Sequence, residues 1–252
     1  MKSLPISPLA IVFIVLEAIA FAAFSYIDVF TNASSIYIKY SAVLLCVVFS
    51  AIYAVKSLLL FFKVIKNNKP EAPRFAAAIL SFFALVFTAL ADLYLLVLGK
   101  KFELGVCFFI CAQVLHAVRI FLLSCEKVRV NTPRKSAAVC AGGRIIVFAA
   151  AFLIIYPFFK NYIIAPLAGG YFCLLLFNFA ECFCLSFRDR RFLLLTAGFL
   201  LFIFCDVCVG LFNLSSVTQT TLPKTLYTAV TYGMWFFYSP SQTLIALSCD
   251  TF

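Results

Sequence analysis

The chain has 252 residues, of which 65% are hydrophobic and only 12% are charged. Soluble domains are usually ~45–50% apolar and ~25% charged, so this composition excludes a water-soluble fold and indicates that the bilayer is the solvent. The formal net charge of +10 does not indicate nucleic-acid binding, because the basic residues lie in short segments between apolar runs instead of forming one patch.

Apolar runs of helical length follow one another along the chain. About 20 apolar residues are needed to cross ~30 Å of hydrocarbon. We expect eight transmembrane helices, at about 7–26, 39–62, 75–98, 103–123, 143–159, 162–187, 191–213 and 225–248. The first run is favoured as a span over a cleaved signal peptide, because it is long and contains Glu17. The sequence therefore predicts an all-α polytopic membrane helix bundle, built as a single integral-membrane domain over residues 1–252.

The lysines and arginines between the runs predict the orientation. One side of the membrane would carry Lys2, Lys63, Lys66, Lys69, Arg74, Lys127, Arg129, Arg134, Lys135, Arg144, Arg188, Arg190 and Arg191. The other side would carry only Lys39, Lys100, Lys101, Lys160 and Lys224. Because basic residues accumulate on the cytoplasmic side, both termini are predicted to be cytoplasmic.

An even number of spans is compatible with an internal duplication. The run "ADLYLLVLG" of the third span parallels "CDVCVGLFN" of the seventh, and "FFICAQVL" of the fourth parallels "FYSPSQTL" of the eighth. These pairs suggest two parallel four-helix repeats, over residues 1–125 and 140–252, related by an axis along the membrane normal.

Cysteine and histidine usage does not indicate a metal site. Most of the eleven cysteines lie in apolar runs, where they act as small soft hydrophobes. His116 is the only histidine, so a zinc site built on several histidines is excluded.

Four carboxylates lie within the spans: Glu17, Asp92, Glu181 and Asp206. An ionised side chain at that depth costs roughly 2.5–3.5 kcal/mol on insertion scales, which makes intramembrane carboxylates candidate functional groups. Asp92 and Asp206 lie at nearly the same depth, toward the outer leaflet, because their spans run in the same direction. The alternative is a shared structural proton that joins two helices. Glu17 and Glu181 are instead expected to pair with Lys56 or Arg119, or to reach the interface.

Other polar residues at helical spacing suggest a lined, partly hydrated pocket around this pair. They are Gln113 and His116 on the fourth span, Asn178 on the sixth, Asn213 on the seventh, and Tyr238 and Gln242 on the eighth. The structural alternative is that such residues hydrogen-bond between helices and only hold the bundle together.

The segments "ADLYLLVLGKKFELGVCFFICAQVLHAVRIF", "GFLLFIFCDVCVGLFN" and "YGMWFFYSPSQTLIALS" together resemble the YhhN-type lysoplasmalogenase family of eight-span membrane proteins. The resemblance implies hydrolysis of the vinyl ether bond of lysoplasmalogens, a class of lysophospholipid, to a fatty aldehyde and a glycerophospho-alcohol. It places the two family aspartates at Asp92 and Asp206, and the tyrosine and glutamine of the last helix at Tyr238 and Gln242. Many relatives have His then Tyr on the fourth span where this chain has Gln113 and His116, which leaves the substrate open.

The residues suit this chemistry. Vinyl ether hydrolysis needs a carboxylic acid that is protonated near neutral pH, and a second group that activates water. Two nearby carboxylates in a low dielectric supply one protonated and one ionised partner, although the sequence does not say which is which. The side chains of Gln113, His116, Asn178, Asn213, Tyr238 and Gln242 are candidates to orient water or substrate. No metal or organic cofactor is expected, the partners are membrane lipids, and the location implied is a bacterial-type plasma membrane.

Two other functions use the same carboxylates. A proton-coupled transporter or lipid carrier fits intramembrane carboxylates and repeats, although no span has a Gly–Pro break beside either aspartate. An intramembrane aspartyl protease is disfavoured, because the aspartates follow Ala and Cys and not the Tyr and Gly-x-Gly typical of that class. A structural or receptor-like membrane protein is the remaining alternative.

Overall fold

The computed structural model describes residues 7–31, 33–65, 72–127, 133–158, 163–217 and 223–251. This part of the chain is helical, without a strand, which confirms the all-α prediction. The helices are α1 (Pro8–Phe30), α2 (Ile36–Ile65), α3 (Ala72–Asp92), α4 (Phe102–Lys127), α5 (Pro133–Ile155), α6 (Ile164–Ser186), α7 (Phe192–Val217) and α8 (Lys224–Thr251). A π-helical turn η1 (Leu93–Val97) follows α3, and a 3-10 turn η2 (Tyr156–Phe158) follows α5.

Within the described residues, six segments are long and apolar enough to cross a bilayer, which makes the chain a multi-pass integral membrane protein. They comprise α1, α2, α3 with η1, α4, α6 and α7. In α5 the apolar stretch is shorter, Ala141–Ile155. The helix α8 is not among these six spans, because its serine, threonine and glutamine residues lower its mean hydropathy. The count of eight spans therefore stays a prediction.

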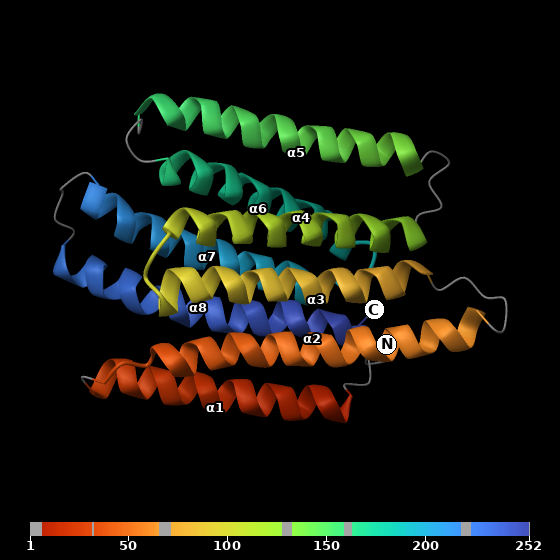
Figure 1. Cartoon of the computed structure of the whole chain (residues 1–252), viewed down its shortest axis with the longest axis horizontal. Coiled ribbons are helices and arrows are strands. Elements are labelled where there is room, and N and C mark those ends of the chain that lie inside the picture. The colour runs from red at the N-terminus through yellow and green to blue at the C-terminus, as the bar shows by residue number, and fades with distance from the viewer. Residues whose placement is uncertain are drawn as a thin grey trace.

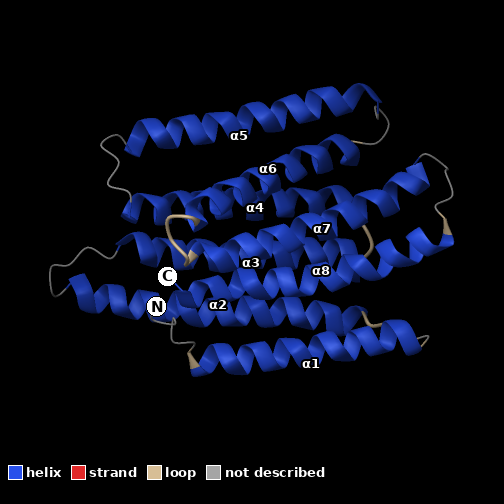
Figure 2. Cartoon of the chain, turned by 180° about the vertical axis from the view of Figure 1, so that it is seen from behind, coloured by secondary structure: helices blue, strands red, loops and turns tan. Residues whose placement is uncertain are grey.

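The helices lie side by side with their axes roughly aligned (Figures 1 and 2). Each helix contacts the next in the order α2, α3, α4, α6, α7, α8. Because α8 also contacts α2, these six helices form a closed ring. Outside the ring, α1 packs on α2 and α8, and α5 packs on α6. Accordingly α1 and α5 occupy opposite edges of the bundle in both views. Helices α3 and α7, which carry the two aspartates, belong to opposite sides of the ring.

Packing in one half of the ring has a counterpart in the other. The packing order α2–α3–α4 in one half matches the packing order α6–α7–α8 in the other. Likewise, α1 packs on α2 as α5 packs on α6. This is the pairing that the two predicted repeats would produce. The duplication itself stays a prediction.

Both ends of the described chain meet at one end of the bundle (Figure 1). The Ser7 backbone N–H donates to one carboxylate oxygen of Asp250 at 3.2 Å, and the Tyr53 hydroxyl donates to the other. The start of α1 is thereby fixed to α2 and α8. Of the basic residues on which the predicted orientation rests, Lys2, Lys66, Lys69, Arg129 and Lys160 lie outside the described residues.

Small residues set two of the close approaches that shape the ring. At Gly105 of α4, an added Cβ would lie 2.5 Å from Cγ of Leu95 in η1. On α7, a Cβ at Gly198 would lie 3.1 Å from the backbone oxygen of Ser241 and 2.8 Å from Cγ1 of Ile245, both on α8. A Cβ at Gly198 would therefore be too close to Ile245 and in tight contact with the α8 backbone, so glycine lets α7 and α8 approach closely.

Candidate active site

Asp92 lies at the last residue of α3, where the helix widens into the π-turn η1. The turn is defined by the bond from Leu98 N–H to the Leu93 carbonyl, an i to i+5 spacing at 2.8 Å. Single π-turns inside helices occur frequently at functional sites. The carboxylate of Asp92 accepts a hydrogen bond from the Tyr238 hydroxyl of α8 at 2.5 Å, and the two residues are only 5% and 4% exposed.

Asp206, on α7, shares its surroundings with Asp92. Tyr171 of α6 and Cys205 of α7 each interact electrostatically with both carboxylates, which places the two aspartates in one region of the ring. The prediction that spans three and seven bring their aspartates to a common depth agrees with this arrangement. Unlike Asp92, Asp206 has a buried oxygen, Oδ2, without a hydrogen-bond partner in the described part of the chain. The Tyr171 hydroxyl lies beside Asp206, but it too has no partner within hydrogen-bond geometry among the described residues.

Aromatic rings surround the carboxylates. The ring of Phe202, one turn before Asp206, lies with its centroid 5.5 Å from Tyr238 and 6.4 Å from Tyr171. Phe109 of α4 packs against Tyr171 at 5.5 Å, and Trp235 packs edge-on against Tyr238 at 5.2 Å. A low-polarity shell with negative ring faces disfavours water and can stabilise a transient cation.

A polar network lies further along α4 and α6. The Asn178 amide donates to both the side-chain and the backbone oxygen of Gln113, each at 2.9 Å. Arg144 of α5 donates to Asn178 Oδ1 at 3.3 Å and forms an ion pair with Glu181. The expected pairing of Glu181 with Lys56 or Arg119 is wrong, since Arg144 of α5, at the start of the predicted fifth span, forms the ion pair instead.

The remaining predicted residues lie at different distances from the aspartates. Gln242 is buried one turn beyond Tyr238 and donates to Ser241 at 3.3 Å. His116 is also buried, edge-on to Phe199 with ring centroids 5.4 Å apart, one turn beyond Gln113. Asn213 is exposed, and its amide donates to the Val209 carbonyl of its own helix at 2.9 Å. The structure therefore gathers Asp92, Asp206 and Tyr238 directly, while Asn213 lies apart.

Sequence reasoning missed three neighbours of the site. Nothing in the sequence pointed to Cys205 except its position next to Asp206. Nothing pointed to Tyr40 of α2, which interacts electrostatically with Asp92. Tyr171 did have a signal in the sequence, because it lies in a row with Asn178 and Glu181 at helical spacing. The sequence did not show that Tyr171 lies beside Asp206 of α7, while Asn178 and Glu181 contact α4 and α5.

Taken together, the geometry offers a buried carboxyl group, that of Asp92, and a half-buried one, that of Asp206, in different hydrogen-bond settings among aromatic rings. Comparisons with known proteins agree with the resemblance seen in the sequence. The sequence model of the YhhN family matches residues 48–249, which run from within α2 to the last turn of α8 and include both aspartates. No curated protein and no solved structure gives a significant match. Because the family match covers more than half of the chain, the protein belongs to the YhhN family.

Proposed function

We propose that the protein hydrolyses the vinyl ether bond of lysoplasmalogen-type lysophospholipids, releasing a fatty aldehyde and a glycerophospho-alcohol. Membership of the YhhN family supports a membrane hydrolase of this type. The substrate would be a lipid of the surrounding bilayer, in a bacterial-type plasma membrane. A carboxylic acid and a carboxylate in an aromatic, water-poor site match the demands of this reaction.

One observation carries the proposal: the two aspartates are chemically identical but differ in their hydrogen bonds. Asp92 accepts a hydrogen bond from the Tyr238 hydroxyl at 2.5 Å, and a hydrogen bond of this kind favours the ionised form of a carboxyl group. Asp206 has a buried oxygen that no group in the described residues serves, which favours its neutral form. Asp206 is therefore assigned as the general acid, and Asp92 as the carboxylate that activates water.

The steps then balance. Asp206 gives its proton to the vinyl carbon distal to the ether oxygen, and the substrate becomes an oxocarbenium ion. Asp92 takes a proton from a water whose oxygen attacks the carbon next to the ether oxygen, which gives a hemiacetal. Asp206 then removes the hemiacetal hydroxyl proton while Asp92 protonates the departing oxygen. The products are the aldehyde and the alcohol, and both aspartates return to their starting states.

Aromatic side chains fit the intermediate of this path. The oxocarbenium ion carries positive charge, which the ionised Asp92 and the face of a ring such as Phe202 can stabilise. The fatty chain would lie among the phenylalanines and leucines of the bundle. The glycerol oxygens require hydrogen-bond partners, for which Gln113 and Gln242 are the buried amides nearest along their helices to Phe109 and Tyr238.

The test is direct. Purified protein in detergent is incubated with 1-alkenyl-lysophosphatidylethanolamine, and aldehyde release is coupled to an alcohol dehydrogenase. We expect Asp206→Asn and Asp92→Asn each to lower kcat by ~10²–10⁴-fold, the usual range for a general acid or base. Asp189→Asn is the matched control, because this carboxylate pairs with Arg191 in the turn before α7 and should leave activity unchanged.

Two outcomes would contradict the proposal. Aldehyde release by both site variants at the wild-type rate would remove the two-aspartate mechanism. Uptake of the intact lipid into vesicles without cleavage would favour the lipid-carrier alternative. Against a carrier, α8 continues from Lys224 to Thr251 through Pro240, without the broken helix that many transporters place at their binding site.

A further inference from the structure

An ion pair lies at the end of the bundle away from the two described chain ends. Lys39, in the first turn of α2, has its ammonium 2.7 Å from a carboxylate oxygen of Asp28, in the last turn of α1. The Ser35 hydroxyl donates to the other Asp28 oxygen, and Tyr232 of α8 donates to the Asp28 backbone carbonyl at 3.2 Å. Three helices therefore meet at Asp28 and Lys39, which we call the corner pair.

The Lys39 ammonium also lies over two aromatic rings. Its nitrogen is 5.2 Å from the ring centroid of Trp235 on α8 and 5.8 Å from that of Phe24 on α1. The side chains of Lys39 and Asp28 are only 12% and 21% exposed, so water and salt screen these interactions weakly. A lysine ammonium within about 6 Å of an indole is attracted to the face of the ring. The corner pair therefore holds the Trp235 ring in one orientation.

Trp235 transmits this constraint to the candidate active site. It packs edge-on against Tyr238, one turn later on α8, with the ring centroids 5.2 Å apart. The Tyr238 hydroxyl in turn donates to Asp92 at 2.5 Å. A hydrogen bond of this kind depends on the orientation of the donor ring, which packing neighbours hold in place. Direct contacts thus run from Lys39 to Asp92, through Trp235 and Tyr238.

The start of α2 is close to Asp92 by a second observation. Tyr40, the residue after Lys39, interacts electrostatically with the Asp92 carboxylate. Although α1 lies outside the closed ring, it provides Asp28 and Phe24, which both hold Lys39. The corner pair lies outside the residues that match the family model, 48–249. The contacts of this chain alone therefore connect it to the site.

We propose that Lys39 is a positioning residue for the proposed hydrolysis, and that it acts through Trp235 on the Tyr238 hydroxyl. The inference rests on the proposed function, in which Asp92 activates water. Without the Lys39 charge, the indole is free to turn, and the Tyr238 hydroxyl spends less time on Asp92. The chemical step then slows. Binding of the lipid is unaffected, because Lys39 acts on the carboxylate and not on the substrate.

A double-mutant cycle with the full chain in detergent measures this coupling. Lys39→Gln removes the charge but keeps a hydrogen-bond donor for Asp28. It should lower kcat for 1-alkenyl-lysophosphatidylethanolamine about two- to five-fold, with KM unchanged. In a Tyr238→Phe background, where no hydroxyl remains to be positioned, the same change should have no further effect. Lys39→Arg keeps a cation over the indole and should retain the wild-type kcat.

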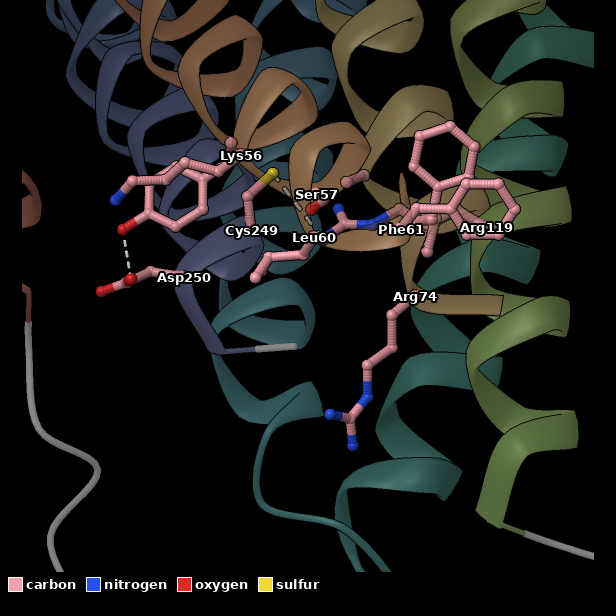
Figure 3. Close-up of a pocket in the computed structure, with 12 residues that line it drawn as sticks. Lys56, Ser57, Leu60, Phe61, Arg74, Arg119, Cys249 and Asp250 are labelled. Carbon is pink, nitrogen blue, oxygen red and sulfur yellow. Dashed lines mark hydrogen bonds between the residues drawn. The ribbon is translucent and has the colours of Figure 1, made fainter. Parts of the chain in front are cut away.

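Lys56→Gln is the matched control. Lys56 also lies over an aromatic ring, 4.9 Å from the centroid of Tyr53, but it belongs to the opposite part of α2, about 25 Å from Lys39 along the helix. Figure 3 shows Lys56 there, at a pocket that Asp250 also lines. This variant should keep the wild-type kcat in both backgrounds.

Fluorescence tests the first contact directly, because Trp235 is the only tryptophan of the chain. The emission maximum of Lys39→Gln should differ from that of the wild type, since a charge beside the indole has been removed. The emission of Lys56→Gln should match the wild type. An unchanged emission maximum in Lys39→Gln would show that the ammonium does not act on Trp235, and would overturn the inference.

The cycle can also be measured on Tm, which requires no turnover. The effects of Lys39→Gln and Tyr238→Phe on Tm should be non-additive, because the two residues hold the same ring. Additive effects on Tm, or equal falls of kcat in the two backgrounds, would overturn the inference. Aldehyde release that Lys39→Gln leaves unchanged would reject only the positioning role. Non-additive effects on Tm in a chain whose wild type releases no aldehyde would reject only the hydrolase.

Discussion

At the scale of single residues, one hydroxyl group distinguishes the two aspartates. The Tyr238 hydroxyl donates a hydrogen bond to Asp92, whereas the Tyr171 hydroxyl lies beside Asp206 without reaching hydrogen-bond geometry. In the comparison of spans four and eight, the residue that aligns with Tyr238 is Phe109, which has no hydroxyl. If the halves arose by duplication, this difference would help to give one half an acid and the other a base.

Tyr238→Phe should therefore lower kcat with the fold intact. The change deprives the buried Asp92 carboxylate of a charge-assisted hydrogen bond worth roughly 1.5–3 kcal/mol, or about 10–100-fold in rate if it acts in the transition state. Aldehyde release at saturating substrate is the measurement. Tyr227→Phe is the control, because this exposed ring of the same helix contacts Phe212, far from the aspartates. Equal effects of the two changes would deny Tyr238 its role.

The proposed proton transfer to carbon leaves an isotopic mark. In D₂O, the acid proton of Asp206 exchanges with solvent, so the released aldehyde should carry one deuterium on the carbon next to its carbonyl group. Mass spectrometry of the trapped aldehyde would show a product heavier by about one mass unit. Authentic aldehyde kept in D₂O with the Asp206→Asn variant corrects for background exchange. A product without the label would show that the bond is cleaved without carbon protonation.

At the scale of helices, the site depends on how closely neighbouring helices approach. The pair α7–α8 carries Asp206 and Tyr238, and Gly198 sets its spacing near Ser241 and Ile245. The contact between α4 and α6 is fixed differently, by the Asn178–Gln113 hydrogen bonds. The α7–α8 pair thus packs closely because glycine has no side chain, whereas the α4–α6 pair is joined by hydrogen bonds between amide side chains.

Gly198→Val should destabilise the protein. Overpacking of this kind costs about 1–3 kcal/mol, which for a chain of this size corresponds to a fall in Tm of roughly 2–10 °C. Thermal unfolding in detergent, followed by circular dichroism, measures the shift. Gly210→Val on the same helix is the control, because an added Cβ there meets nothing within 4 Å. If Gly198→Val unfolds at the same temperature as the wild type and Gly210→Val, the prediction is wrong, and the close approach of α7 and α8 is not needed for stability.

At the scale of the whole molecule, a closed ring of six helices surrounds the aspartates, and α1 and α5 flank it. Both described chain ends meet on one side of the bundle through Ser7 and Asp250. That arrangement requires an even number of crossings, a condition that the six apolar spans and the predicted eight both meet.

A cleavable tag at either end should be protected in right-side-out vesicles and cut in inverted ones. The reason is the excess of basic residues predicted on the side of the two ends. The same tag inserted between Gly99 and Lys100, in the turn between η1 and α4, should give the opposite pattern. Immunoblotting after protease treatment reads out all three positions. Cleavage of the two end tags from opposite sides would require an odd number of crossings.

Much of this architecture follows from the sequence, because apolar runs of fixed length must become helices in a bilayer. The aspartate pair is predictable as well, since charge within such runs is rare and its depth can be counted along the helix. Side-chain partners are not. Counting apolar residues places Arg144 at the boundary of the fifth span, and its pairing with Glu181 depends on how α5 packs on α6. The role of Tyr171 likewise depends on a rotation of α6 that periodicity leaves open.

The closed ring has one further consequence, for the kind of lipid that it can admit. Its centre is filled by side chains such as Phe109, Phe199 and Phe202, each nearly inaccessible. Any guest must push a pair of adjacent helices apart and displace some of this packing, and the work rises with the volume inserted. A lipid with one hydrocarbon tail disturbs about half as much of the interior as a lipid with two. The bundle would thus select its substrate by bulk, before any head group or reactive bond has been recognised.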